Sequence, residues 1–430
     1  MKTVMNSRLR FYAYKQKNWL KRVLRPSRLV LGRLPYQAKL LFARIMVRLF
    51  PFISIDPDRL YPPAQACDST CQWVSSAGRQ FQARIWEIDP ACTVSNPLPK
   101  TVHQAIRRQF LMDQAYDYPE TFVANIPKGR VTNRGFVITP DRRLLNDVST
   151  SFHDPSKTIT GALSDDWRLK PLSEIDGRVA VLATDGANLY YHWLFQLLPR
   201  YELIRRAGIN LRDIDFFLVN TQKSGFQRDT LASLGIAPSK ILDGDSISHI
   251  RASELVVPSV PLGGGCFRPW MTDFLRDVFL LKNPGAIRPL GQRFYISRAR
   301  AGYRRVLNEE AVMERLSRHN FKVLEMEKLT VEEQAAAMAS CEAIVAPHGG
   351  GLSNLVFCSP GTKVIEIFSP ELVATYFWKL SNQLKLDYYY LLGQGSAATL
   401  DTDYPQSWDA RADIRVDLEM LERTLTLANL

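Results

Sequence analysis

The stretch AIVAPHGGGLSNLVFCSPGTKVIEIFSP, residues 343–370, alternates apolar runs with glycine- and proline-containing turns. It predicts a strand over Ala343–Pro347, a short helix from Gly351 and a second strand over Lys363–Phe368. Such a strand–turn–helix unit directs free backbone N–H groups and the positive end of a helix dipole beyond the strand's carboxyl end. The triple glycine favours close contact with an anion, such as a nucleotide diphosphate, over the alternative of a flexible turn packed on the sheet.

Strand and helix patterns alternate on the N-terminal side of this stretch and continue past it. Strands are expected first at 179–184, 215–220 and 254–258, with helices at 191–207 and 226–234. A second series has strands at 293–298, 321–326, 343–347 and 363–368, and helices at 308–319, 331–340 and 372–383. This alternation predicts parallel sheets with crossover helices. The expected fold class is α/β, with two Rossmann-like domains facing a cleft.

The length of 430 residues also favours two domains, because a single core stops growing below this size. We expect a basic helical arm and linker over 1–66, an acceptor-side α/β domain over 67–285 and a Rossmann-like domain over 286–400. Residues 401–430 should hold a last helix, about 408–427, packed back on the body. Between 73 and 166 the pattern is of short strands, with a hairpin over 134–149 that turns at Pro140 and Asp141.

The net charge of +12 is concentrated at one end of the chain. Residues 1–50 contain 13 Lys and Arg and no Asp or Glu, which leaves 42 basic and 43 acidic residues for the rest. Bulky apolar residues alternate with these charges, which suits a helix on an anionic membrane surface or one docked on its own protein. No apolar run approaches the roughly 20 residues that span a bilayer. We expect a cytoplasmic protein, either soluble or peripheral on the inner membrane, that does not bind nucleic acid.

The cysteines and acidic triplets do not form a metal site by their spacing. Cys341 and Cys358 lie in apolar contexts and are expected to be buried, whereas Cys67–Cys71 and Cys71–Cys92 stay open as disulfides beside the simpler assumption of a reducing cytoplasm. Asp-x-Asp triplets occur at 56–58, 213–215, 243–245 and 401–403, and only 243–245 lies in a glycine-containing loop. We expect no metal ion and no cofactor.

Two polar side chains accompany the glycine turn. Arg298 ends an expected strand, where a guanidinium can hold phosphate through two hydrogen bonds. Arg300, Arg304 and Arg305 follow in what is equally well an exposed basic loop. Glu366 interrupts an apolar strand, and it either hydrogen bonds ribose hydroxyls or forms a salt bridge at the end of the sheet.

A second group of candidates precedes and begins the helix expected at 191–207. His192 follows the strand at 179–184, so its imidazole would face the same cleft and act as a general base on a sugar hydroxyl. The alternative is a core histidine beside Trp193. Asp185 is a lesser catalytic candidate, and Asn188 and Arg200 are candidates for the acceptor side.

Three motifs together resemble glycosyltransferase family 61: YYHWLFQLLPR at 190–200, YISR at 295–298 and APHGGGLSNLVFCSPGTKVIEI at 346–367. The resemblance covers roughly 134–390. It implies a GT-B-like fold and an inverting transfer from a nucleotide-diphosphate sugar, with no required metal and an acceptor bound near His192. The family's donor contacts correspond to these positions: Arg298, His348, Gly349, Gly350, Gly351, Asn354 and Glu366.

This chain departs from many relatives at Gln196, where they carry an acidic residue. The departure leaves His192 or Asp185 as the base. The expected function is transfer from a donor, most simply UDP-linked, to a glycan or lipid-linked acceptor in capsular or other surface polysaccharide synthesis. The alternatives are a GT-B-like epimerase, which would consume donor without acceptor, and a non-catalytic polysaccharide-binding scaffold at the membrane.

Overall fold

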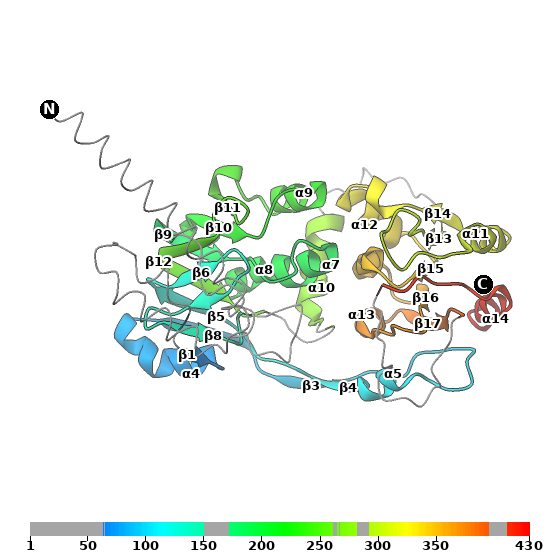
Figure 1. The fold of residues 1–430 in the computed structure, drawn as a ribbon, viewed down its shortest axis with the longest axis horizontal. Coiled ribbons are helices and arrows are strands. Elements are labelled where there is room, and N and C mark those ends of the chain that lie inside the picture. Colours follow the sequence, from blue (N-terminus) through cyan, green and yellow to red (C-terminus); the bar gives the residue numbers. More distant parts are fainter. Residues whose placement is uncertain are drawn as a thin grey trace, which may run out of the picture.

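A computed structural model describes residues 63, 65–149, 172–260, 265, 267–281, 292–394 and 411–430. The expected basic arm at 1–50 and the acidic triplets at 56–58 and 401–403 lie outside the described residues. Two sheets organise the described part, one on each side of a layer of helices (Figure 1). The structure is therefore a mixed α/β fold, and its parallel strands are compatible with a Rossmann-like arrangement.

The second sheet consists of five parallel strands in the order β14-β13-β15-β16-β17. Their bounds are β13 (Arg293–Ile296), β14 (Lys322–Leu324), β15 (Ala343–Pro347), β16 (Lys363–Phe368) and β17 (Asp387–Leu392). The first four confirm expected strands, and β17 was not expected. Because β14 lies on one side of β13 and β15 on the other, the connections change direction between β13 and β15.

The first sheet is mixed: the strands expected at 179–184, 215–220 and 254–258 are parallel, as predicted, and antiparallel strands from earlier in the chain join the same sheet. Its ten strands follow the path β1-β8-β7-β6-β12-β9-β10-β11, and β5 joins β12 to β2. They are β1 (Gln65–Cys67), β2 (Arg84–Asp89), β5 (Thr121–Pro127), β6 (Arg130–Thr132), β7 (Val137–Ile138), β8 (Arg143–Leu145), β9 (Ser173–Val181), β10 (Phe216–Val219), β11 (Ile241–Asp243) and β12 (His249–Pro258). The run β12-β9-β10-β11 is parallel, whereas β5, β6 and β7 pair antiparallel with their neighbours. The antiparallel pair β7 and β8 confirms the expected hairpin.

The helices between the sheets share one continuous hydrophobic core with the facing side of each sheet. From the first half come α7 (Tyr190–His192), the π-helical segment η2 (Trp193–Leu197), α8 (Leu198–Arg206), α9 (Gly225–Ser233), α10 (Pro269–Arg276) and η5 (Asp277–Leu281). From the second half come α12 (Val331–Ala339), η7 (Gly350–Phe357) and α13 (Tyr376–Gln383). The helix expected at 191–207 is thus continuous, and it consists of α7, the π-helical segment η2 and α8.

One segment of the first half crosses to the second sheet. It leaves through β3 (Cys92–Ser95), includes α5 (Arg108–Met112) and returns through β4 (Ala115–Tyr118), and Figure 1 shows it beneath both halves. Lys100 forms a parallel bridge with Tyr389 of β17, and the Trp378 indole N–H donates to the Pro97 carbonyl. Residues 97–112, which the sequence places in the N-terminal domain, therefore lie on the C-terminal sheet.

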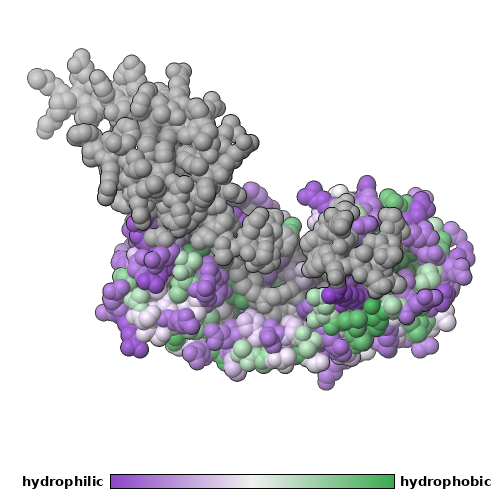
Figure 2. Space-filling view, turned by 60° about the horizontal axis from the view of Figure 1, so that its bottom comes forward, coloured by the Kyte–Doolittle hydropathy of each residue, from purple (hydrophilic) through white to green (hydrophobic). Residues whose placement is uncertain are grey.

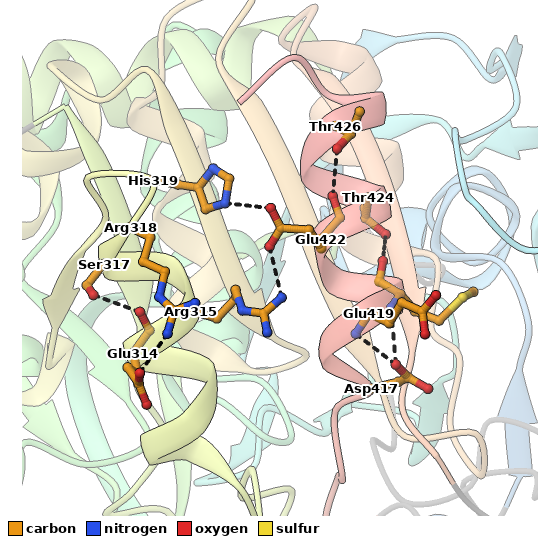
Figure 3. A network of polar contacts seen from close by, with 11 residues as sticks. Glu314, Arg315, Ser317, Arg318, His319, Asp417, Glu419, Glu422, Thr424 and Thr426 are labelled. Atoms are coloured by element: carbon orange, nitrogen blue, oxygen red, sulfur yellow. Dashed lines mark hydrogen bonds and ion pairs between the residues drawn. The ribbon is translucent and has the colours of Figure 1, made fainter.

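The last helix, α14 (Leu418–Leu427), packs on the outer face of the second sheet beside α11 (Glu309–Ser317). Figure 3 shows the Glu422 carboxylate between Arg315, at 3.2 Å, and His319, at 2.9 Å. Asp417 caps the helix by accepting the first main-chain N–H groups. The expected start at about residue 408 is wrong, because residues 411–417 are not helical and include Ile414 and Arg415, which form β-bridges with Val306 and Gln394.

The remaining short helices are α4 (Thr70–Ser75), η1 (Ala77–Phe81), η3 (Leu211–Asp213), η4 (Pro238–Lys240) and η6 (Met326–Lys328). Among the described helices, none has the length and apolar composition to cross a bilayer. Figure 2 shows a largely hydrophilic face with hydrophobic residues gathered on the half that carries the second sheet.

Candidate active site

The glycine turn and Arg298 meet where the connections of the second sheet change direction. Arg298 follows β13 and His348 follows β15, and these two strands are parallel neighbours. In open α/β sheets this is the point at which ligands bind. The Arg298 guanidinium lies against Gly349 so closely that a Cβ at that position would overlap it. The structure therefore brings together the two strongest features of the sequence.

Arg298 is held by main-chain carbonyls and not by a carboxylate. Its Nε donates to the Arg304 carbonyl at 3.3 Å and its Nη2 to the Tyr303 carbonyl at 3.1 Å. Within the described residues no carboxylate lies at ion-pair distance from its guanidinium. Burial, followed by the charge of Arg304, lowers the pKa of Arg298. A half-buried cation without an ion-paired carboxylate is suited to an anionic ligand.

Backbone amides complete this corner. The helix η7 begins at Gly350, and the N–H groups of a first helical turn have no acceptor within the helix. A Cβ at Gly350 would meet nothing within 4 Å, so the space beside this residue is open. Gly351, by contrast, packs against Ile296. The open side of the turn is therefore at Gly350.

His348 and Glu366 form a buried pair below the turn. The His348 ring donates from Nδ1 to Glu366 Oε1 at 2.5 Å, and the Tyr388 hydroxyl donates to Oε2 at 2.6 Å. Glu366 is fully buried and His348 is 5% exposed. Both oxygens of the Glu366 carboxylate accept hydrogen bonds from neighbouring side chains, so the carboxylate is not accessible to a ribose hydroxyl. Its contacts correspond to the salt-bridge alternative.

Asn354 is also buried, and it links the two halves. Its amide nitrogen donates to Gln334 Oε1 and to the Gly351 carbonyl, and its oxygen accepts from the Tyr190 hydroxyl at 2.9 Å. Burial raises the pKa of Tyr190, so this hydroxyl stays protonated as the donor. Asn354 thus holds the first turn of η7 and ties it to α7.

His192 lies at the end of α7, directly before the π-helical segment. Its Nδ1 hydrogen bonds the Gln196 amide oxygen at 3.0 Å. Because that oxygen only accepts, Nδ1 carries the proton and the lone pair of the neutral ring is on Nε2. Burial lowers the pKa of His192, whereas Gln196 and Asp185 oppose the shift. The ring is therefore held neutral, as a general base requires.

Asp185 lies in the loop after β9 and forms a bidentate ion pair with Arg134. The two hydrogen bonds measure 3.0 and 2.9 Å, and Asp185 is 8% exposed. Its carboxylate is near enough to His192 to favour the protonated imidazole electrostatically. This arrangement suits an electrostatic partner of His192 better than an independent base.

The two acceptor-side candidates differ in exposure. Asn188 is exposed on the loop before α7. Arg200 is fully buried, donates to the carbonyls of Val148, Val181 and Ala183, and has its pKa lowered by burial to about 9. It supports the loop that carries Asp185 and does not face solvent, so the structure does not offer it to an acceptor.

The start of α7 contacts the elements beside the glycine turn. Tyr191 packs on Phe377 of α13 with ring centroids 5.8 Å apart, and His348 packs on the same ring at 5.6 Å. Together with the Tyr190–Asn354 hydrogen bond, these contacts place the His192 helix against η7 and α13. The candidate base and the candidate anion corner thus border one aromatic cluster.

The cysteines and the acidic triplet at 243–245 contribute nothing to this site. Cys341 and Cys358 are buried, as expected, and Cys67, Cys71 and Cys92 are free thiols. Asp243 accepts from the Asp245 main chain, and Asp245 accepts from Thr221 and pairs with Lys223. Within the described residues no cluster of three metal-ligating side chains occurs.

Comparison with known proteins agrees with this geometry. Residues 190–365 match the family Glycosyltransferase 61, and the matched region runs from the first residue of α7 into β16. It therefore contains His192, Arg298 and the glycine turn. This match confirms the resemblance to glycosyltransferase family 61 and supports glycosyltransferase activity. No curated protein matches the chain.

Several residues of the site were missed by sequence reasoning. Arg134 pairs with Asp185, Tyr190 with Asn354, and Glu309 accepts from the Tyr295 and Ser297 hydroxyls beside Arg298. Only Glu309 had a local signal, because an acidic residue in the first turn of a helix is a common capping feature. The other pairs are 51 and 164 residues apart and require the fold.

Proposed function

We propose that this protein is an inverting glycosyltransferase with a GT-B-like arrangement that uses a nucleotide-diphosphate sugar, with UDP as the nucleotide. The observation that carries the proposal is the contact of the unpaired Arg298 guanidinium with the glycine turn at the carboxyl ends of β13 and β15. A diphosphate there would accept hydrogen bonds from Arg298 and from the amides at the start of η7.

In the proposed reaction His192 is the base. Its Nε2 takes the proton of an acceptor hydroxyl, and the resulting oxygen attacks the anomeric carbon from the face opposite the diphosphate. The anomeric carbon–oxygen bond breaks as the new glycosidic bond forms, and the electron pair leaves with the diphosphate. The positive charge of Arg298, and not a divalent ion, stabilises the negative charge of that leaving group.

The proposed acceptor is a glycan or a lipid-linked glycan of surface polysaccharide synthesis, handled in the cytoplasm or at the inner face of the membrane. Support for an apolar component comes from the acceptor side. Tyr376 packs on Tyr191 at 5.7 Å and is 37% exposed, and Leu111 and Met112 of α5 are 50% and 63% exposed. The Thr375 hydroxyl before α13 donates to the Asp113 carboxylate just after α5, and the apolar side chains exposed on these two elements would suit the lipid part of such an acceptor.

The test is donor turnover by the wild type and by His192→Ala and Arg298→Ala. UDP release from UDP-hexoses, UDP-N-acetylhexosamines and UDP-pentoses is measured with and without a surface-glycan acceptor, and NMR gives the anomeric configuration of the product. We expect a fall of 10²- to 10⁴-fold for His192→Ala. Near-normal turnover in both variants would overturn the proposal, and acceptor-independent donor conversion would favour an epimerase.

A further inference from the structure

We propose that Arg298 and Arg304, which both contact the Tyr303 ring, form a two-guanidinium site for phosphoryl groups, in which Arg304 is a second ligand. The identity of the ligand as a nucleoside diphosphate rests on the proposed function. The assignment of Arg304 rests on contacts of the loop itself.

The four arginines of this loop divide into two classes. Arg300 pairs with Glu325 at 3.1 Å, and Arg305 pairs with Asp413 at 2.8 Å. For Arg298 and Arg304, no carboxylate lies within ion-pair distance in the part of the chain that the structure describes. In a uniformly solvated basic loop, the guanidinium groups would not divide into paired and unpaired ones in this way.

The two unpaired groups are close together. The guanidinium carbons of Arg298 and Arg304 lie 5.7 and 4.9 Å from the centroid of the Tyr303 ring. The charge of Arg304 is close enough to oppose protonation of Arg298. Cation–π contacts offset part of this repulsion. A bound diphosphate would offset the rest, because each guanidinium can hold phosphate oxygens through a fork of two N–H groups.

Arg304 also carries an unused donor. Its Nε is buried and has no hydrogen-bond acceptor among the described residues. A buried N–H without an acceptor is costly, and natural proteins rarely retain one without a reason. An oxyanion at this position would provide the acceptor.

The backbone fixes Arg304 in place. Its φ of 54° lies in the left-handed region, and its N–H donates to the Arg411 carbonyl at 3.2 Å. Just beyond it, Val306 forms a parallel bridge with Ile414. Non-glycine residues in this region of φ are uncommon, and such strained positions cluster at ligand sites. The C-terminal segment thus holds the loop in a preformed shape.

The experiment compares Arg304→Asn with Arg300→Asn by isothermal titration calorimetry. Asparagine tolerates the left-handed conformation, so Arg304→Asn removes the guanidinium with little added backbone strain. The probes are inorganic pyrophosphate, UDP and uridine. We expect Arg304→Asn to bind pyrophosphate and UDP at least tenfold more weakly and uridine unchanged, and Arg300→Asn to match the wild type within twofold.

Each outcome decides the matter. Equal affinities in Arg304→Asn and the wild type, or an equal loss in both variants, would overturn the assignment. Pyrophosphate binding that depends on Arg304, without UDP binding or donor turnover, would keep the anion site and reject the proposed function. Absence of pyrophosphate and UDP binding in the wild type would reject both. If Arg304→Asn does not fold, Arg304→Lys replaces it, and its point charge should still bind pyrophosphate several-fold more weakly than arginine.

Discussion

The Arg298 guanidinium occupies the space that a side chain at Gly349 would need. The φ of Gly349 is 170°, an extended conformation open to any residue, so the requirement for glycine is one of space. Gly349→Ala should therefore displace Arg298 and leave the main chain unchanged. We expect UDP affinity to fall about tenfold or more, equivalent to the loss of one charge-assisted hydrogen bond.

Gly225→Ala is the matched control for that variant, because Gly225 is the first residue of α9, outside the glycine turn, and a Cβ there would meet only Asp229 Oδ2 at 3.8 Å, an ordinary contact. Calorimetry with UDP and thermal unfolding measure both proteins. Similar melting temperatures with weaker binding in Gly349→Ala alone are expected. A Gly349→Ala protein that binds UDP as the wild type does would contradict a role for this contact.

The partner of His192 sets the pH range in which it can act as a base. Burial lowers the pKa of His192 in the wild type, so the neutral form persists below the ordinary value of about 6.5. The acid limb of kcat/KM should accordingly lie below pH 6.5. Gln196→Glu places a negative charge on Nδ1–H, which favours the imidazolium and moves this limb to higher pH. The pH profile of donor turnover tests the shift.

Gln72→Glu, an exposed substitution on α4, adds the same charge far from His192 and should leave the profile unchanged. An acid limb that stays in place in Gln196→Glu would mean that another group titrates in the reaction.

Glu366 should matter for folding before it matters for binding. Glu366→Leu leaves the buried His348 Nδ1–H and the Tyr388 hydroxyl without their acceptor. We expect the free energy of unfolding to fall by about 2–5 kcal/mol. Urea denaturation measures the loss. Glu342→Leu removes an exposed ion pair with Arg293 just before β15 and should cost no more than about 1 kcal/mol. Equal costs for the two variants would refute the structural role of Glu366.

The loop that carries Asp185 depends on a close backbone approach from Gly135. This residue has a φ of 80°, and a Cβ there would overlap the Ala183 carbonyl. Gly208 has a similar φ of 74° and open space around it. Gly208→Ala should therefore cost about 1–2 kcal/mol from strain alone, and Gly135→Ala should cost clearly more. Chemical denaturation of the two variants isolates the overlap, and the same cost in both would show that the loop can shift.

Most strands of the C-terminal sheet could be predicted from the sequence, because each of them is a short apolar run followed by a turn and an amphipathic helix. The position of Arg298 beside the glycine turn follows from the adjacency of β13 and β15. The strand β17 was missed because DYYYLL carries three polar-tipped residues. Two of these tyrosine hydroxyls find partners only in the fold, Tyr388 on Glu366 and Tyr390 on the Ala105 carbonyl.

The pairing of strands in the first sheet was harder to predict, because its antiparallel strands pair over long sequence distances. Local apolar patterns show neither that β5 and β6 add to β12 nor that residues 97–112 cross to β17. The same limit applies to the site. His192, Arg298 and the glycine turn had local signals, whereas the burial of Glu366, Asn354 and Arg200 depends on packing that no single motif encodes.

The crossing segment at 97–112 has a consequence for how this protein can be divided or recombined. The Lys100 carbonyl accepts from the Tyr390 main chain, and the Tyr390 hydroxyl accepts from the Arg107 main chain. A fragment that starts after residue 285 would expose the β17 edge and the aromatic surface beneath it. A chimera that exchanges one half with a relative must keep the crossing segment at 97–112 together with the C-terminal half. The segment is nevertheless encoded nearly two hundred residues before that half begins.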